Sequence, residues 1–396
     1  MAEQQIALPA GANLGERYYP AFDGIRAVAA CMVFVDHYGG FSYWGAGVSI
    51  FFVLSGFLIT GVLYDARDTV HRFRRFYIRR SLRIFPVYYA FWILMLALTP
   101  LVQAQWNRGN LLYVVYAGNH IWGMFNGSAE GHEAWVHLLV RPVSFGGKVH
   151  EWFPLYLGHF WTLSVEEQFY LVWPLVVFNV RSRNALIRIC LLTVAVVFSA
   201  RVMTAIWLPD HLNLLTHITI LRCDEFLLGG GAALFLRGEN AQRLLRRGGR
   251  IFFAGLMGVG ISVVLCCYRI ATISTLRETQ WTFTVQTAMF DVLALGAILL
   301  AMQEKTLGAR MLCWRPLRAL GRISYGFYLF HDIPHELYDR AATWMVACLP
   351  FALDREAVTA PVSAVLAFCC TIVLASLSFR FIERPFLRLK NRWARA

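Results

Sequence analysis

The sequence predicts an all-α fold, a polytopic transmembrane helical bundle of about ten spans with both termini in the cytoplasm. Of its 396 residues, 58% are hydrophobic and only 15% are charged, and the mean hydropathy is +0.52. Apolar windows of about 17 to 25 residues, the length that crosses a bilayer, recur along almost the whole chain. Because backbone groups in lipid cannot reach water, these windows must form helices.

The ten windows leave no stretch that could build an independent soluble domain. They are residues 22–41, 45–64, 86–103, 160–180, 185–207, 216–236, 251–269, 283–302, 323–340 and 357–380. We expect one membrane domain over residues 18–390, between a cytoplasmic N-terminal tail of residues 1–17 and a C-terminal tail of residues 391–396. Residues 1–17 are polar and lack a signal-peptide core, so the first span is expected to be its own signal anchor.

The basic residues predict the orientation of the bundle. With both termini inside, inner segments hold 27 of the 37 lysines and arginines, outer loops hold 7, and the remaining three lie within spans. This is a strong positive-inside signal and predicts a multi-pass protein of the bacterial cytoplasmic (inner) membrane. It also accounts for the net charge of +13, so no nucleic-acid partner is expected.

The first span carries four ionisable residues, Asp23, Arg26, Asp36 and His37. Such groups are costly in lipid unless they face a partner or a polar cavity, so they are functional candidates. Arg26 and His37 are separated by almost three helical turns and therefore share one face, roughly 16 Å apart. This stripe predicts a reaction site or a conduction path.

The inner loop from Asp65 to Phe85 is rich in arginine. One interpretation is a topogenic belt that binds lipid phosphates. However, Arg79, Arg80 and Arg83 crowd against the start of the third span, where a solvated belt would not need them. Guanidinium groups bind phosphates in bidentate fashion, so the alternative is a site for an anionic cytosolic cosubstrate such as a nucleotide or coenzyme A.

Residues 104–159 form the only long outer loop, with four tryptophans and five histidines. Its aromatic residues fit either a headgroup belt or a lid over a sugar-like ligand. The histidines lack the spacing of zinc ligands, and the nine cysteines of the chain fall within or beside spans without paired spacings. We therefore expect neither a metal site nor disulfides.

Acidic residues lie near the outer ends of two further predicted spans, the fourth and the sixth. Ser164 and Glu167 fit a helix capping box, whereas Glu166 has no such structural explanation and could meet the imidazole of His37. In the sixth span, Arg222 and Asp224 lie at a similar depth. A buried ion pair of Arg222 with Asp224 or Glu225 is the structural alternative to a role in the site.

Six stretches, taken in order, carry a family resemblance. They are the Arg26 to His37 pair, Phe51–Ile59, Arg79–Pro86, Trp161–Tyr170, Gly321–His331 and Phe381–Phe386. Together they closely resemble the acyltransferase-3 family of membrane O-acyltransferases, over about residues 18–390. The resemblance implies transfer of an acyl group, usually acetyl, from cytosolic acyl-CoA to a hydroxyl of an extracytoplasmic glycan, lipopolysaccharide or exopolysaccharide. Lipid-linked glycans and macrolide-like acceptors are further possibilities, and membrane lipids are general partners.

The resemblance also implies roles for residues. The family pattern puts its arginine and histidine motif at Arg26 and His37, its paired arginines at Arg79 and Arg80, and its acidic motif at Ser164–Glu167. A hydroxyl attacks a thioester only when a base removes its proton, and neutral imidazole suits that role, so His37 is the expected base.

Other site residues are assigned around this base. Asp36 points about 100° away on the helix, so Glu166 is the better candidate to orient the His37 ring. Arg26 could bind the donor's phosphates or stabilise the oxyanion. The full set of candidates is catalytic His37, Glu166 and Asp36; donor-binding Arg26, Arg79, Arg80 and Arg83; and acceptor-binding Glu167, Trp161, Arg222 and Asp224. No metal is required, and acetyl-CoA or another acyl-CoA is the cosubstrate.

Several conspicuous residues have structural interpretations. His331, Ser324 and Tyr325 are expected to pack or to form structural hydrogen bonds, and Ser55 to bond within its own or a neighbouring helix. Gly229, Gly230 and Gly231 are expected to allow close helix packing, since no lysine or serine follows them to form a phosphate loop.

A proton-coupled transporter or flippase of a glycan or lipid precursor is the rival class, because proton relays also use embedded Arg, Asp, Glu and His. Against it, the sequence shows no inverted repeat and no matching pair of broken spans. A glycosyltransferase is a weaker rival. Turnover of labelled acetyl-CoA separates these classes.

Overall fold

The computed structural model describes residues 18–39, 45–124, 137–141, 153–208, 212–272, 276–303, 305–348 and 354–393, and these are predominantly helical. Among these residues, six helices are long and apolar enough to cross a membrane, which agrees with a multi-pass membrane protein. They are α2 (Ala46–Ala66), α3 (Arg72–Val102), α8 (Arg183–Trp207), Ala241–Leu265 of α11 (Ala241–Thr272), Phe283–Ala301 of α12 (Leu276–Ala301), and the continuous segment Ala357–Leu389.

Three of the four other predicted spans differ from these six for physical reasons. Helix α1 (Pro20–Tyr38) is 19 residues long but carries two aspartates and an arginine. Helix α10 (Cys223–Phe235) has 13 residues, and the predicted span 323–340 is divided into α15 (Ser324–Phe330) and α16 (His335–Ala347). The count of ten spans and the cytoplasmic placement of the termini therefore stay predictions.

The chain divides into two compact units, each with its own core. In the described residues, the first unit comprises 18–29, 45–72, 168–208, 212–272, 276–303 and 305–321, and the second comprises 30–39, 73–124, 137–141, 153–167, 322–348 and 354–393. Helices α1 and α7 (Trp161–Asn179) each contribute residues to both units.

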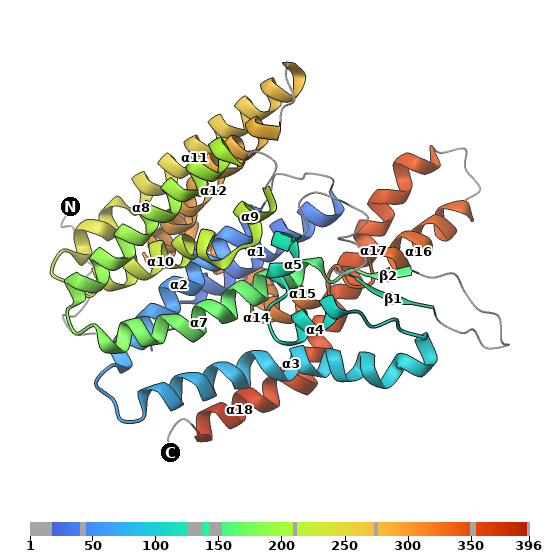
Figure 1. Cartoon of the computed structure of the whole chain (residues 1–396), viewed down its shortest axis with the longest axis horizontal. Coiled ribbons are helices and arrows are strands. Elements are labelled where there is room, and N and C mark those ends of the chain that lie inside the picture. Colours follow the sequence, from blue (N-terminus) through green and yellow to red (C-terminus); the bar gives the residue numbers. More distant parts are fainter. Residues whose placement is uncertain are drawn as a thin grey trace. The chain divides into compact units, whose positions relative to one another are not determined.

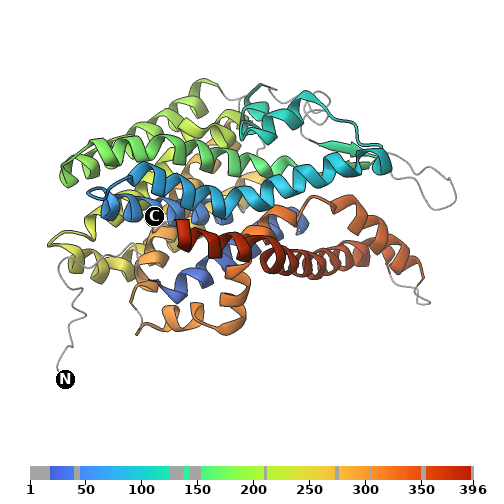
Figure 2. The same ribbon diagram turned by 90° about the horizontal axis from the view of Figure 1, so that it is seen from below.

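The first unit is built from α2, α8, α10, α11 and α12, and α11 and α12 run side by side (Figures 1 and 2). Its shorter elements are α9 (Leu212–His217), η2 (Thr219–Leu221), α13 (Leu307–Leu312) and most of α14 (Arg315–Arg322). Glycines allow α2 and α10 to approach closely, because a Cβ on Gly56 would overlap the carbonyl of Phe226 and one on Gly229 would overlap that of Val53. The packing role predicted for Gly229 is thus confirmed.

The second unit contains α3, α15, α16 and α17 (Arg355–Ser378), with α16 beside α17 (Figure 1). The chain continues from α17 through η3 (Phe379–Glu383), a π-helical turn, into α18 (Arg384–Trp393). Shorter helices are α4 (Arg108–Val114), α5 (Asn119–Met124) and the 3-10 turn η1 (Gly158–Phe160).

The second unit also has a small sheet that an all-α prediction missed. Strands β1 (Leu138–Val140) and β2 (Phe153–Leu155) pair antiparallel, with Leu138 opposite Leu155. Just beyond β2, the amide of Tyr156 donates to the carbonyl of Ile333 at 3.0 Å. The sheet therefore fixes the start of α7 next to the segment between α15 and α16. Short strands of this kind lack the alternating pattern that sequence reasoning can detect.

Candidate active site

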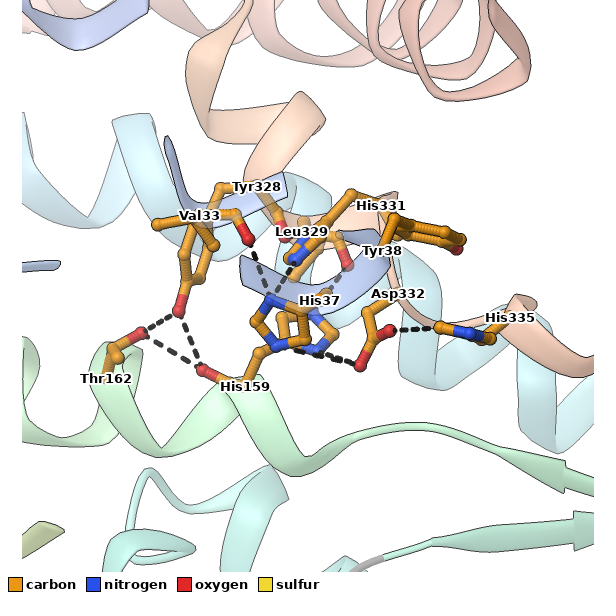
Figure 3. Close-up of polar contacts among 10 residues, drawn as sticks. All are labelled: Val33, His37, Tyr38, His159, Thr162, Tyr328, Leu329, His331, Asp332 and His335. Atoms are coloured by element: carbon orange, nitrogen blue, oxygen red, sulfur yellow. Dashed lines mark hydrogen bonds and ion pairs between the residues drawn. The ribbon is translucent and has the colours of Figure 1, made fainter. Parts of the chain in front are cut away.

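Three imidazoles and one carboxylate converge in the second unit (Figure 3). His37 comes from the end of α1, His159 from η1, and His331 and Asp332 from the break between α15 and α16. All of them lie outside the six candidate membrane-spanning helices. The ring centroid of His331 is 4.8 Å from that of His37 and 4.8 Å from that of His159.

The hydrogen bonds of His37 define its tautomer. Its Nδ1 lies 2.8 Å from the carbonyl oxygen of Val33, which can only accept, so Nδ1 carries the proton in the neutral ring. His37 Nδ1 also lies 3.5 Å from Nε2 of His331. The Nε2 atom of His37 therefore keeps its lone pair, as a general base requires.

His331 is arranged to support that tautomer. Its Nδ1 lies 2.6 Å from the carbonyl oxygen of Tyr328 and must donate, which leaves Nε2 as an acceptor toward His37. The His331 side chain is fully buried, and burial lowers its pKa well below the ordinary value for histidine. His331 is thus a buried, neutral hydrogen-bonding partner of His37, which agrees with the structural hydrogen bonds expected of it.

Asp332 supplies the carboxylate of the cluster. Its Oδ2 lies 3.9 Å from Nε2 of His37 and 3.8 Å from Nδ1 of His159, and its Oδ1 accepts from Nδ1 of His335 at 2.9 Å. Burial acts to raise the pKa of Asp332, but the bond from His335 and the surrounding imidazoles outweigh it and lower the pKa below the ordinary range. Asp332 is therefore ionised beside His37.

His159 is held as a neutral ring. Its Nε2 lies 3.0 Å from the carbonyl oxygen of Leu329 and donates to it. Burial lowers the pKa of His159 to about 4, although the charge of Asp332 opposes this. Its backbone is fixed too, because the hydroxyls of Thr162 and Tyr328 both donate to the His159 carbonyl at 3.0 Å.

A second polar group in the same unit joins α3 to the start of α7. An Arg80 guanidinium nitrogen lies 3.0 Å from Glu166 Oε1, and Arg80 Nε lies 3.7 Å from Glu167 Oε1. The structure thus brings together three predicted site residues, Arg80, Glu166 and Glu167. The carboxylate found beside His37 is Asp332, so the orienting role proposed for Glu166 stays a prediction.

The capping box predicted for Ser164 and Glu167 is wrong. Helix α7 begins at Trp161, so Ser164 lies inside it and its hydroxyl donates to the Phe160 carbonyl at 3.3 Å. The 3-10 turn η1 directly precedes α7, so the helix begins before Ser164 and not at it. Glu167 contacts Arg80 instead.

The remaining predicted residues lie in different surroundings. In the second unit, Trp161 is the first residue of α7, Asp36 is half-buried near the end of α1, and Arg83 is exposed on α3. In the first unit, Arg26 donates to Asp23 at 3.0 Å. Their proposed roles in the site stay predictions.

The charges of the sixth predicted span form ion pairs within the first unit. Nε of Arg222 lies 2.8 Å from Glu225 Oε1, and Asp224 pairs with Arg201 of α8. All four side chains are buried. The structural alternative given for Arg222 is thus the arrangement observed, with Glu225 as the partner. Acceptor binding by Arg222 and Asp224 stays a prediction.

Sequence reasoning missed His159 and Asp332. Both signals were present, since His159 lies two residues before Trp161 and Asp332 directly follows His331. Neither residue can be related to His37 by the periodicity of a helix, because each lies in a different, irregular segment: His159 in η1 and Asp332 in the break between α15 and α16. Within the described residues, no three His, Cys, Asp or Glu side chains are placed to hold a metal ion.

The fold and this cluster define a helical membrane protein in which three histidines and a carboxylate lie together. A family model described as an acyltransferase domain matches residues 19–380, nearly the whole chain. The chain therefore belongs to the acyltransferase-3 family. No solved structure matches it.

Curated relatives are similar to most of this chain. YrhL of Bacillus subtilis, which carries the name of a peptidoglycan O-acetyltransferase, is 30% identical over 394 residues, covering 93% of this chain and 55% of the relative. The peptidoglycan O-acetyltransferase OatA of Listeria monocytogenes is 26% identical, covering 93% and 56%. The O-acetyltransferase OatA of Staphylococcus aureus is 24% identical, covering 93% and 57%. The chain thus spans little more than half the length of these relatives.

Proposed function

We propose that this chain is an integral membrane O-acyltransferase that moves an acyl group, acetyl in the simplest case, from cytosolic acyl-CoA to a hydroxyl of an extracytoplasmic glycan. The observation that carries the proposal is the tautomer of His37. With Nδ1–H directed to the Val33 carbonyl and to His331, Nε2 is the proton acceptor, and the Asp332 carboxylate lies 3.9 Å from it. Family membership supports the same reaction class.

The reaction needs one base and balances without a further reactant. As the acceptor oxygen attacks the thioester carbonyl carbon, Nε2 of His37 takes the hydroxyl proton. The tetrahedral intermediate then collapses, the carbon–sulfur bond breaks, and the proton passes from His37 to the departing thiolate. The products are an ester and the free thiol of coenzyme A.

Asp332 stabilises the charged state of His37 that exists between these two proton transfers. Opposite unit charges about 4 Å apart attract by about 4 kcal/mol at an effective dielectric constant of about 20. Asp332 keeps its negative charge through its bond to His335, so it needs no reorganisation during the reaction. His331 and the Val33 carbonyl hold the ring in the productive orientation.

The donor is proposed to bind at the arginines of α3. Arg83 follows Arg79 by four residues and Arg80 by three, so it lies on the same side of the helix as both. Glu166 holds Arg80, and Glu166 lies seven residues after His159, about 10 Å along a helix. The histidine cluster and the arginines proposed to bind the donor therefore both lie beside the first turns of α7, within one unit. A thioester arm could bridge them while its phosphates stay at α3.

The acceptor is proposed to be a cell-wall glycan such as peptidoglycan. The support is the names of the relatives from Bacillus subtilis and Listeria monocytogenes. An extracytoplasmic glycan would place the protein in the bacterial cytoplasmic membrane, which agrees with the distribution of arginine and lysine between the loops.

The test incubates the purified full chain with acetyl-labelled acetyl-CoA and soluble peptidoglycan fragments. The proposal predicts release of the coenzyme A thiol together with label in an alkali-labile ester on the glycan. A transporter or flippase would leave the thioester intact. Intact thioester, from folded protein that binds coenzyme A and is given acceptor, would contradict the proposed function.

A further inference from the structure

His335 takes no part in the proton transfers described above, yet both of its ring nitrogens face carboxylates. Its Nδ1 lies 2.9 Å from Asp332 Oδ1, a bond drawn in Figure 3, and its Nε2 lies 3.5 Å from Asp339 Oδ2, one turn further along α16. A neutral imidazole has a single N–H, so it would direct a lone pair at one of the two carboxylates. Only the imidazolium directs an N–H at both. The geometry therefore favours the charged form of His335.

Neighbouring elements hold the His335 ring between these carboxylates. The Tyr38 ring of α1 stacks on it, with centroids 4.4 Å apart and planes within 8° of parallel, and the Tyr156 ring centroid lies 5.5 Å away. The face of an aromatic ring attracts a cation, so the stack also favours the imidazolium. Ser363 of α17 donates a hydrogen bond to Oδ1 of Asp339, which leaves Oδ2 for His335.

The charges around His335 act in the same direction. Burial acts to lower its pKa, but the hydrogen bond to Asp332 and the charges of Asp332 and Asp339 outweigh burial and raise the pKa above the ordinary value for histidine. Glu336, the other acidic neighbour, is paired with Arg340 at 2.9 Å. The N-terminus of α16 disfavours a cation, and the two carboxylates compensate for this.

A charged His335 affects which imidazole beside Asp332 is basic. Asp332 is buried, and a buried carboxylate requires a cation close to it. His335 Nδ1 meets this need at 2.9 Å, whereas His37 Nε2 lies 3.9 Å from the carboxylate. The N–H groups of His159 and His331 are directed at backbone carbonyls instead. Because a positive charge nearby opposes the addition of a second one, the imidazolium of His335 keeps His37 neutral before the acceptor arrives.

We propose that His335 is a positioning residue of the candidate active site: as an imidazolium held between Asp332 and Asp339, it is the counter-ion of Asp332 and leaves His37 neutral, ready to accept the hydroxyl proton. The inference rests on the proposed function, because it takes His37 as the base of acyl transfer. Two carboxylates still face one cation, so negative charge remains to stabilise His37 when it gains a proton during the reaction.

The test follows both histidines by NMR of the nitrogen-labelled full chain in detergent, and it measures the pH dependence of kcat/KM with labelled acetyl-CoA. In the wild type at neutral pH, His335 should be protonated at both ring nitrogens, and its titration midpoint should lie above that of His37. His335→Asn keeps an amide N–H near the position of Nδ1 and removes the charge.

In His335→Asn, the midpoint of the His37 titration should rise by about one pH unit, because a neighbouring positive charge is lost. The acidic limb of kcat/KM should move to higher pH by the same amount. Loss of folded protein would lower the whole profile without moving this limb.

A second variant examines what holds the proton on His335. Asp339→Asn should lower the midpoint of the His335 titration by about one pH unit, because it removes one of the two negative charges that face the ring. Should His335→Asn not fold, this shift and the order of the two wild-type titrations decide instead.

His71→Asn is the matched control, because it makes the same substitution at an exposed histidine of the first unit. The backbone φ of 56° at His71 is one that asparagine adopts readily, so both titrations and the pH profile should stay unchanged. A neutral His335 in the wild type at neutral pH, or an unmoved His37 titration in His335→Asn, would overturn the inference and leave the proposed function intact. The titrations need no turnover, whereas wild-type protein that leaves the thioester intact would overturn the proposed function and, with it, this role in catalysis.

Discussion

Nε2 of His331 lies 3.5 Å from Nδ1 of His37, on a ring whose Nδ1 also faces the Val33 carbonyl oxygen at 2.8 Å. The Val33 carbonyl and a buried neutral histidine together determine which nitrogen of His37 is basic. The carboxylate of Asp332 then lies next to that basic nitrogen, 3.9 Å away. The arrangement divides two tasks, orientation and charge stabilisation, between adjacent residues of one irregular segment.

The orienting role is tested by His331→Phe, which keeps a ring and removes the acceptor. Loss of one hydrogen bond is worth about 0.5 to 1.5 kcal/mol, so kcat should fall about three- to tenfold. NMR of nitrogen-labelled histidine should show that His37 is protonated at Nδ1 in the wild type. Protonation at Nε2 in the wild type would refute the tautomer assignment.

The charge-stabilising role is tested by Asp332→Asn. Removing about 4 kcal/mol of attraction, partly screened by solvent, should lower kcat about a hundredfold. The Kd of coenzyme A should not change, because Asp332 lies among the histidines and not at the α3 arginines. As a control, Glu336→Gln alters a nearby surface pair with Arg340 and should preserve kcat. Equal kcat values for Asp332→Asn and the wild type would exclude this role.

Donor binding is tested by combining Arg79→Ala with Arg80→Ala. Each lost contact between a guanidinium and a phosphate is worth about 1.5 to 3 kcal/mol, so the Kd of coenzyme A should rise at least tenfold. Arg243→Ala removes an exposed arginine of the first unit and serves as the control. If the double variant binds coenzyme A as the wild type does, these arginines serve only membrane topology.

The buried neutral state of His159 predicts a loss of stability at acidic pH. Its pKa is about 4 in the folded protein and about 6.5 when unfolded, so the unfolded state binds more protons between these values. The free energy of unfolding should therefore fall as the pH is lowered from about 6.5 to 4, by at most on the order of 3 kcal/mol. The midpoint of thermal unfolding in detergent should show this trend, and His159→Gln should reduce its slope. An equal slope in the variant would assign the effect to other groups.

The sequence predicted those features that depend on local pattern. Long apolar helices such as α2, α8 and α12 follow directly from hydropathy, and close helix packing at Gly229 follows from the absence of a side chain. His37 was identifiable because an ionisable residue in an apolar helix is unusual.

The cluster around His37 could not be predicted in the same way. His159 and Asp332 are brought to it by η1, by the bond between Tyr156 and Ile333, and by the break before α16. These are contacts between segments that lie far apart in the sequence and show no periodic pattern of residues. The capping role of Ser164 was likewise misassigned, because the helix begins at Trp161 after a 3-10 turn and Ser164 lies inside it.

The most direct test of the account is acyl transfer by His37→Ala, compared with the wild type in the assay with labelled acetyl-CoA and peptidoglycan fragments. A missing general base lowers the rate by about 10²- to 10⁴-fold. We expect that loss, with unchanged membrane insertion and an unchanged Kd of coenzyme A, since only the proton acceptor is removed. Transfer by His37→Ala at the wild-type rate would contradict the assignment of His37 as the base.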